Sequence, residues 1–165
     1  MTSGLRVVFD TDFLSAFLKI DRLDLVRRFF QVEAAFVPPA VYREIARTDL
    51  LEKLVAVPWI QVQGPEAPGS PILSDDPDLA NLGLGEREAI ALAAERAGST
   101  LLTNDNKARS TAVRRGVVAI TIPAFLLACK DAGVASRDEI SRLVTALEER
   151  DHYGFRKDVR ERLLS

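Results

Sequence analysis

The chain has 165 residues, of which 47% are hydrophobic, a formal net charge of −2 and a single cysteine. This length fits one ordinary domain with a sizeable core, and one cysteine excludes an intrachain disulfide. The small negative charge argues against a basic coat protein for nucleic acid, although an enzyme acting on nucleic acid needs only a local basic rim. Because no segment approaches about 20 continuous apolar residues and no signal-peptide layout is seen, we expect a cytoplasmic protein without a membrane span.

Strands and helices are expected to alternate from the first residues onward. The apolar run at 5–9 predicts a strand, and apolar residues at helical spacing predict a helix over 11–20. A second helix is expected over 22–31, with Asp21 as its N-cap. The next elements in order are a strand at 35–37, a helix from 40 to about 48, a helical stretch over 49–56 and a strand at 59–62.

The second half of the chain repeats this alternation after a break. The stretch 64–78 holds four prolines and predicts a loop. Strands that alternate with helices of about 10–15 residues predict a mostly parallel sheet covered on both faces, which is a three-layer α/β/α domain. The expected elements beyond the loop are helix 85–97, strand 100–102, helix 105–115, strand 117–121, helix 123–132, helix 136–150 with a capping box of Ser136 and Glu139, and helix 155–164.

Four carboxylates occupy positions where α/β proteins bind their ligands. Asp10 follows the first expected strand, and Asp105 comes shortly after the strand at 100–102. Parallel strands bring both acids to the same edge of the sheet. Glu86 continues the small apolar row of its helix, and Glu44 shares a row with apolar residues of its own helix. An acid at the end of a core-facing row is unfavourable unless it is paired, and a cation would pair with it.

Converging carboxylates suit Mg²⁺ or Mn²⁺, which prefer oxygen ligands. The acids repel one another without the ion, and such an ion can activate water and stabilise charge on a phosphodiester. Each acid alone also has an ordinary structural explanation as a helix cap, a partner of the helix dipole or a solvated side chain. The functional interpretation therefore depends on the four acids together.

The acids lie in four short stretches with a recognisable order. These are VVFDTDFL at 7–14, VPPAVYREI at 37–45, GEREAIALA at 85–93 and LLTND at 101–105, the last followed by Ala108 and Arg109. Together they resemble the PIN-domain nucleases, and most closely the VapC-like toxins and related uncharacterised PIN proteins. The resemblance covers about residues 5–133. Asp12 and Glu86 depart from it, because many relatives carry Ser or Asn at the first position and Asp at the second.

The resemblance implies a divalent-metal-dependent endoribonuclease that cuts single-stranded or loop RNA and leaves 3′-hydroxyl and 5′-phosphate ends. Its catalytic acids map to Asp10, Glu44, Glu86 and Asp105, with Asp10, Asp105 and Glu86 as metal ligands. It also implies a toxin restrained by a small antitoxin, and a homodimer. Residues 1–150 would form the PIN-like nuclease domain, and 151–165 a C-terminal helical extension of it. The apolar edge of that extension could dock on its own domain, on a second subunit or on an antitoxin.

Several polar residues beside the acids are candidates for substrate binding. Arg109 could hold an RNA phosphate or belong to a solvated helix face. Thr11, Thr103 and Asn104 flank the strand-end acids and could contact substrate or only form turn hydrogen bonds. His152 is the only histidine and lies in a polar stretch near the C-terminus. Its distance from the acids in the sequence favours metal-activated water over a histidine base.

Two other interpretations use the same residues. The run from Phe9 to Asp12 also fits the Asp-x-Asp start of a haloacid-dehalogenase-like phosphatase, in which the first acid is the nucleophile. That family has Gly-Thr soon after the second Asp, whereas Phe13 follows here, and Asp75–Asp76 falls in the proline-rich loop instead of after a strand. The other alternative is a catalytically silent PIN-like protein-binding module, which predicts that the acids are lost.

Overall fold

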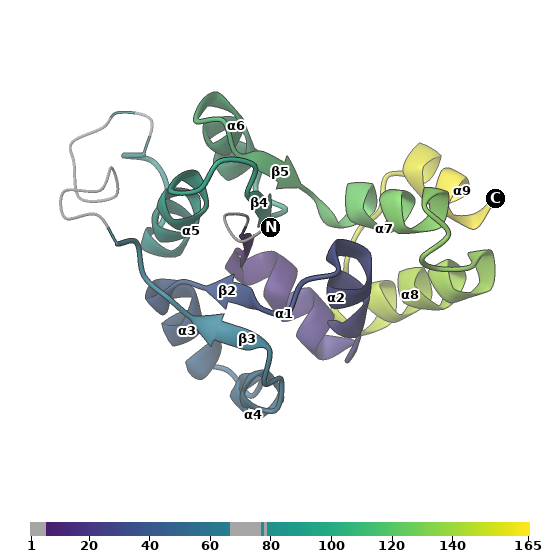
Figure 1. The fold of residues 1–165 in the computed structure, drawn as a ribbon. Coiled ribbons are helices and arrows are strands. Elements are labelled where there is room, and N and C mark those ends of the chain that lie inside the picture. The colour runs from purple at the N-terminus through teal and green to yellow at the C-terminus, as the bar shows by residue number, and fades with distance from the viewer. Residues whose placement is uncertain (1–5, 67–76, 78) are drawn as a thin grey trace.

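The computed structural model describes residues 6–66, 77 and 79–165 (Figure 1). Most of the proline-rich stretch 64–78, including Asp75 and Asp76, lies outside the described residues. The described chain forms a five-stranded sheet in the order β3-β2-β1-β4-β5, and all neighbouring strands are parallel. This arrangement confirms the predicted α/β class. The strands are β1 Val7–Phe9, β2 Ala35–Val37, β3 Ile60–Val62, β4 Thr100–Leu102 and β5 Val118–Ile120.

Helices cover both faces of the sheet, as predicted for a three-layer domain (Figure 1). Alternate residues of β1 face opposite layers: Val7 and Phe9 pack into one core, and Val8 packs into the other. None of the helices in the described part of the chain is both long and apolar enough to cross a membrane. The helices are α1 Thr11–Lys19, α2 Asp24–Phe30, α3 Pro39–Ala46, α4 Leu51–Val55, α5 Leu84–Ala94, α6 Asn106–Arg114, α7 Ile122–Asp131, α8 Arg137–Arg150 and α9 Lys157–Leu164.

The larger core lies between the sheet and the helices α1, α2, α7 and α8. Its centre is aromatic: the rings of Phe13 and Phe17 in α1 lie 5.7 and 5.8 Å from the ring of Phe125 in α7. Burial of such rings contributes about 2–3 kcal/mol each. This packing fixes α1 firmly against the sheet, and its first turn therefore holds a defined position at the edge where β1 ends.

Two capping predictions need correction. Asp21 does not cap α2, which begins at Asp24 after Leu23. Asp21 instead sits in a turn with φ +56°, and its carboxylate lies 3.1 Å from the ammonium of Lys53. Ser136 does cap α8, because its Oγ accepts from the amide N–H of Glu139 at 3.1 Å.

The Glu139 carboxylate does not complete the expected capping box. It accepts from the guanidinium groups of Arg22 and Arg28 on the neighbouring segment. These charge-assisted bonds are stronger than a bond to a backbone N–H of the same turn, so the tertiary contact prevails over the local one.

The C-terminal helix α9 docks on its own chain, which selects one of the three docking alternatives. Leu163 is fully buried in the larger core. The Arg160 guanidinium pairs with Glu148 of α8 at 2.8 Å, and the Lys130 ammonium donates to the carbonyls of Arg162 and Ser165 at 2.8 and 2.7 Å. The cation at the C-terminus of α9 satisfies carbonyls that have no partner within the helix. The division of the chain into a nuclease domain at 1–150 and a C-terminal extension at 151–165 stays a prediction.

Candidate acidic site

Asp10 lies at the carboxyl end of β1, in the middle of the sheet. Its amide donates to the carbonyl of Leu102 at 2.9 Å, which keeps it in register with β4. The side chain is only 3% exposed. Its Oδ1 accepts from the Thr11 amide at 2.8 Å, and its Oδ2 accepts from the Thr103 hydroxyl at 2.6 Å. Asp10 therefore caps α1, which is the structural explanation that the sequence offered for this acid. It also presents a buried carboxylate at the edge of the sheet.

Burial raises the pKa of Asp10 to about 6 from 3.8, because the charged form loses its hydration. The hydrogen bonds from Thr103 and Thr11 oppose this rise. The negative charges of Glu86 and Asp12 add to it. The fold thus places a carboxylate where its charge is unfavourable and surrounds it with further acids.

Asp105 is joined to Asp10 through one hydroxyl group. The Thr103 Oγ that donates to Asp10 also accepts from the Asp105 amide at 3.1 Å. The Asp105 Oδ1 accepts from the Ala108 amide at 2.8 Å, which makes Asp105 the N-cap of α6. The two strand-end acids therefore share a fully buried threonine between them, as expected from parallel strands.

Glu86 and Glu88 of α5 point to different parts of the molecule. The Glu86 Oε2 accepts from the Gly83 amide at 3.0 Å. Partial burial raises the pKa of Glu86, the Gly83 bond lowers it, and the charges of three acids, Asp105 foremost, raise it further. Glu88 instead accepts from the Ala40 amide at 2.9 Å and so satisfies a free N–H at the start of α3. Of these two glutamates, only Glu86 belongs with the strand-end acids.

Glu44 approaches the same acids from α3. Its carboxylate is exposed, and its Oε2 accepts from the Thr11 hydroxyl at 2.6 Å. The helices α3 and α5 come close here because position 85 is a glycine. A Cβ on Gly85 would lie 3.0 Å from the Glu44 Oε1 and 3.2 Å from the Val41 Cγ2, tighter than ordinary contacts. Gly85 therefore leaves the space in which Glu44 meets Thr11.

Asp12 is a fifth acid of this group, and the sequence did not distinguish its role from a simple cap. Partial burial of the carboxyl raises its pKa, and the charges of Asp105 and Glu44 raise it further. The signal available was its place in the first turn of α1, two residues after Asp10. We refer to Asp10, Asp12, Glu44, Glu86 and Asp105 as the acidic cluster.

Comparison with known proteins assigns the chain to a family. A family model described as a PIN domain matches residues 6–165. The chain belongs to the PIN-domain family. Neither the curated proteins nor the solved structures gave a match. PIN domains are generally nucleases that use divalent metal ions, which agrees with acids gathered at the carboxyl edge of the sheet.

The side chains of the acidic cluster show whether this chain could hold the divalent metal ion that PIN domains generally use. In the described part of the chain, no three acidic, histidine or cysteine side chains already form a metal-binding group. The carboxylates are nevertheless oxygen donors, and neighbouring negative charges raise the pKa of Asp10 and of Glu86. A divalent cation relieves this repulsion. The hydrogen bonds to Glu86 and Asp105 each use one carboxylate oxygen, Oε2 and Oδ1 respectively. By the chemistry of their donors, the residues fit a hard cation.

The structure gives the predicted substrate residues different surroundings. Thr103 is fully buried and acts through Asp10 and Asp105, so it does not face a substrate. Thr11 is half-buried and holds Glu44. The Asn104 Oδ1 accepts from the Ile122 amide at 2.9 Å at the start of α7. Arg109 is exposed on α6, where it is accessible to a phosphate.

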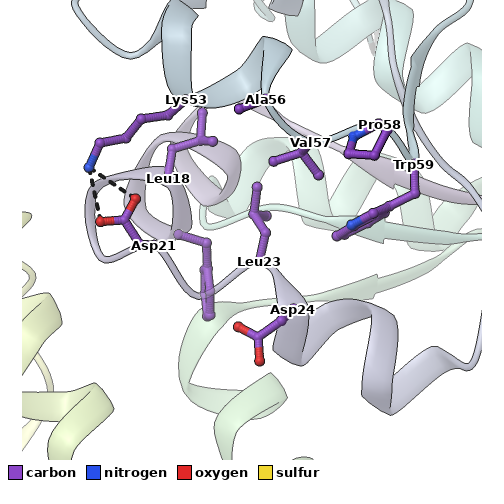
Figure 2. A pocket seen from close by; sticks show the side chains of 10 residues that line it. Leu18, Asp21, Leu23, Asp24, Lys53, Ala56, Val57, Pro58 and Trp59 are labelled. Carbon is purple, nitrogen blue, oxygen red and sulfur yellow. Dashed lines mark hydrogen bonds and ion pairs between the residues drawn. The ribbon is translucent and has the colours of Figure 1, made fainter.

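A more apolar groove in the described part of the chain lies elsewhere. Figure 2 shows it at the far end of α1, between Leu23, Val57 and Trp59, with the Asp21–Lys53 ion pair at its rim. Its volume is about 380 Å³. The Arg27 guanidinium lies 5.9 Å from the centre of the Trp59 ring, and this ring packs against the larger core. The groove is therefore separate from the acidic cluster, which surrounds the N-terminus of the same helix.

Proposed function

We propose that this PIN domain is a Mg²⁺- or Mn²⁺-dependent endoribonuclease that hydrolyses phosphodiester bonds of single-stranded or loop RNA. The observation that supports this most strongly is Asp10: a carboxylate 3% exposed, with a pKa of about 6, among four other acids. A strongly perturbed acid in such surroundings is typical of a functional site. Family membership removes the support for the phosphatase alternative, and the presence of all the expected acids speaks against a catalytically silent module.

In this proposal Asp10, Asp105 and Glu86 would hold the cation directly, and Glu44 would complete the site. When bound, the ion supplies an activated water and stabilises charge on the phosphodiester. Thr103 orients both strand-end acids through one hydroxyl, and Thr11 fixes Glu44. The products carry 3′-hydroxyl and 5′-phosphate ends.

One further residue and the partners complete the proposal. Arg109 contacts an RNA phosphate from the exposed face of α6. The family resemblance supports action as a homodimeric toxin restrained by a small antitoxin protein. The open reading frame beside the gene would encode that partner, and its co-expression should suppress RNA cleavage.

The proposal is tested by cleavage of an end-labelled single-stranded RNA in Mg²⁺ or Mn²⁺. Asp10→Asn should lower kcat/KM by at least about 100-fold, which corresponds to about 2.7 kcal/mol of lost transition-state stabilisation. Asp21→Asn is the matched control, because Asp21 pairs with Lys53 at the other end of α1. Full activity in Asp21→Asn and its loss in Asp10→Asn and in chelator are expected. Equal activity of Asp10→Asn and the wild type would overturn the proposal.

A further inference from the structure

A second cavity of about 340 Å³ opens directly beside the acidic cluster. One wall is the exposed side of α1, and the opposite wall is the loop 151–154 between α8 and α9. The residues that line it are Asp12, Ser15, Lys19, Asn104, Asp151, His152, Tyr153 and Gly154.

The cavity and the acidic cluster share residues. Asp12 belongs to both, and its charge interacts with Asp105. Asn104 lines the cavity and immediately precedes Asp105 in the connection from β4 to α6. An RNA strand whose scissile phosphate lies at the cluster would therefore place a neighbouring nucleotide at the mouth of this cavity.

The loop 151–154 is fixed in place by several contacts. The Asp151 Oδ1 lies 2.9 Å from the Lys19 ammonium, and the Tyr153 amide donates to the Leu147 carbonyl at 3.1 Å. The Tyr153 ring contacts the Phe155 ring at 4.7 Å between centres. His152 has a φ of +55°, the left-handed conformation that a non-glycine residue rarely adopts. A loop held this way presents its imidazole and phenol rings in a defined arrangement.

The charges of the cavity select the kind of group that it binds. Asp12 and Asp151 outnumber Lys19, whose ammonium is already paired with Asp151. This balance disfavours a phosphate and favours hydrogen-bond donors. The Asn104 Oδ1 is occupied by the Ile122 amide. The two rings offer surfaces on which a planar group can stack.

We propose that this cavity is a base-binding subsite that takes a nucleobase with an exocyclic amino group, adjacent to the scissile phosphate of the RNA substrate. The amino group donates to the carboxylates of Asp12 or Asp151, while the base stacks on Tyr153 and His152. A uracil offers carbonyl acceptors at the same position and meets negative charge instead. The subsite rests on the proposed nuclease function. It makes Tyr153 and His152 the residues that stack on the base, and Asp12 and Asp151 the residues that select it.

The single histidine gives a direct measurement that is independent of cleavage. The imidazole proton resonances of His152 are unique in this chain, so NMR can follow them during titration with cytidine or uridine at constant pH. These two nucleosides carry no phosphate and differ only at positions 3 and 4 of the base, where cytidine has an acceptor nitrogen and an amino group and uridine has an N–H and a carbonyl. Cytidine should shift the His152 resonances and bind about tenfold more tightly than uridine, the effect of one hydrogen bond. Tyr153→Leu should abolish the cytidine response, whereas the matched variant Tyr42→Leu should retain it.

Two outcomes of the titration would overturn the subsite: no shift of His152 with either nucleoside, or the same affinity for both. An unchanged cytidine response in Tyr153→Leu would do so as well. Cleavage assays separate this result from the nuclease proposal. If the wild type cuts RNA, Tyr153→Leu should raise KM about tenfold for RNA with cytosine beside the cleaved bond and leave kcat nearly unchanged. If the wild type does not cut RNA, the nuclease proposal fails, and the titration alone decides whether the cavity binds a base.

Discussion

The strand β1 carries a buried charge near each end, and the two charges are treated in opposite ways. Arg6 and Asp10 are each 3% exposed and lie four residues apart. The Arg6 guanidinium donates to the Glu95 carboxylate at 3.0 Å and to the Leu92 carbonyl at 3.1 Å. Asp10 accepts only from neutral groups, and the charges that act on it come from other acids. A buried charge that is already neutralised serves the fold, whereas one that is surrounded by like charges is a candidate for binding a proton or a cation.

The largest difference in stability between changes at the two ends of β1 is expected from Arg6→Met. Removing the cation takes away the donor that Arg6 supplies to the Glu95 carboxylate and to the Leu92 carbonyl, so the free energy of unfolding should fall by roughly 3 to 5 kcal/mol. Asp10→Asn should not lower it, because the substitution removes a charge that is unfavourable there. Urea denaturation at neutral pH in chelator measures both. If both variants lost the same free energy of unfolding, the buried charges at the two ends of β1 would not differ in their role.

The next effect concerns pH. The pKa of Asp10 is about 6 in the folded chain against 3.8 for the ordinary carboxyl, so the folded state holds this proton more tightly. The contribution of Asp10 to stability is therefore fully present below about pH 4 and is lost as the pH rises through 6. The stability of Asp10→Asn relative to the wild type should increase by up to about 3 kcal/mol over this range.

Unfolding of metal-free wild type and Asp10→Asn at a series of pH values gives this difference, because titrating groups that do not interact with Asp10 contribute equally to both proteins. A difference that stays flat, or that decreases between pH 4 and 7, would show that Asp10 is not held in the protonated form by its surroundings.

A smaller effect is expected at Thr103, which connects the two strand-end acids. Thr103→Val keeps the shape of the fully buried side chain but removes the donor to Asp10 and the acceptor for the Asp105 amide. The free energy of unfolding should fall by about 2 kcal/mol, and the pKa of Asp10 should rise further. Thr103→Ser keeps the hydroxyl and serves as the control in the same denaturation series. Identical behaviour of the Val and Ser variants would exclude a role for this hydroxyl.

Much of the fold could be predicted from the sequence, because the signals are local. The apolar runs at β1, β2 and β4 and the helical spacing of residues such as Phe13 and Phe17 each specify their own element. Alternation of these elements then implies the parallel sheet, which brings Asp10 and Asp105 to one edge. The capping role predicted for Asp21 was wrong because α2 begins three residues later, at Asp24, and Asp21 lies in the preceding turn, where it pairs with Lys53.

The details of the acidic cluster depend on contacts between distant segments, which a sequence pattern does not encode. The Thr11–Glu44 hydrogen bond joins residues 33 positions apart and requires the small Gly85 between two helices. The role of Glu88 at the start of α3 has the same origin. The loop 151–154 beside Asp12 could not be foreseen, because its position depends on the docking of α8 and α9.

Direct binding of Mn²⁺, followed by the EPR signal of the free ion, tests the central claim that the acidic cluster is a cation site. We expect the wild type and Asp21→Asn to bind Mn²⁺ with the same affinity, and Asp10→Asn and Asp105→Asn to bind it at least about tenfold more weakly. Undiminished Mn²⁺ affinity in both Asp10→Asn and Asp105→Asn would contradict it.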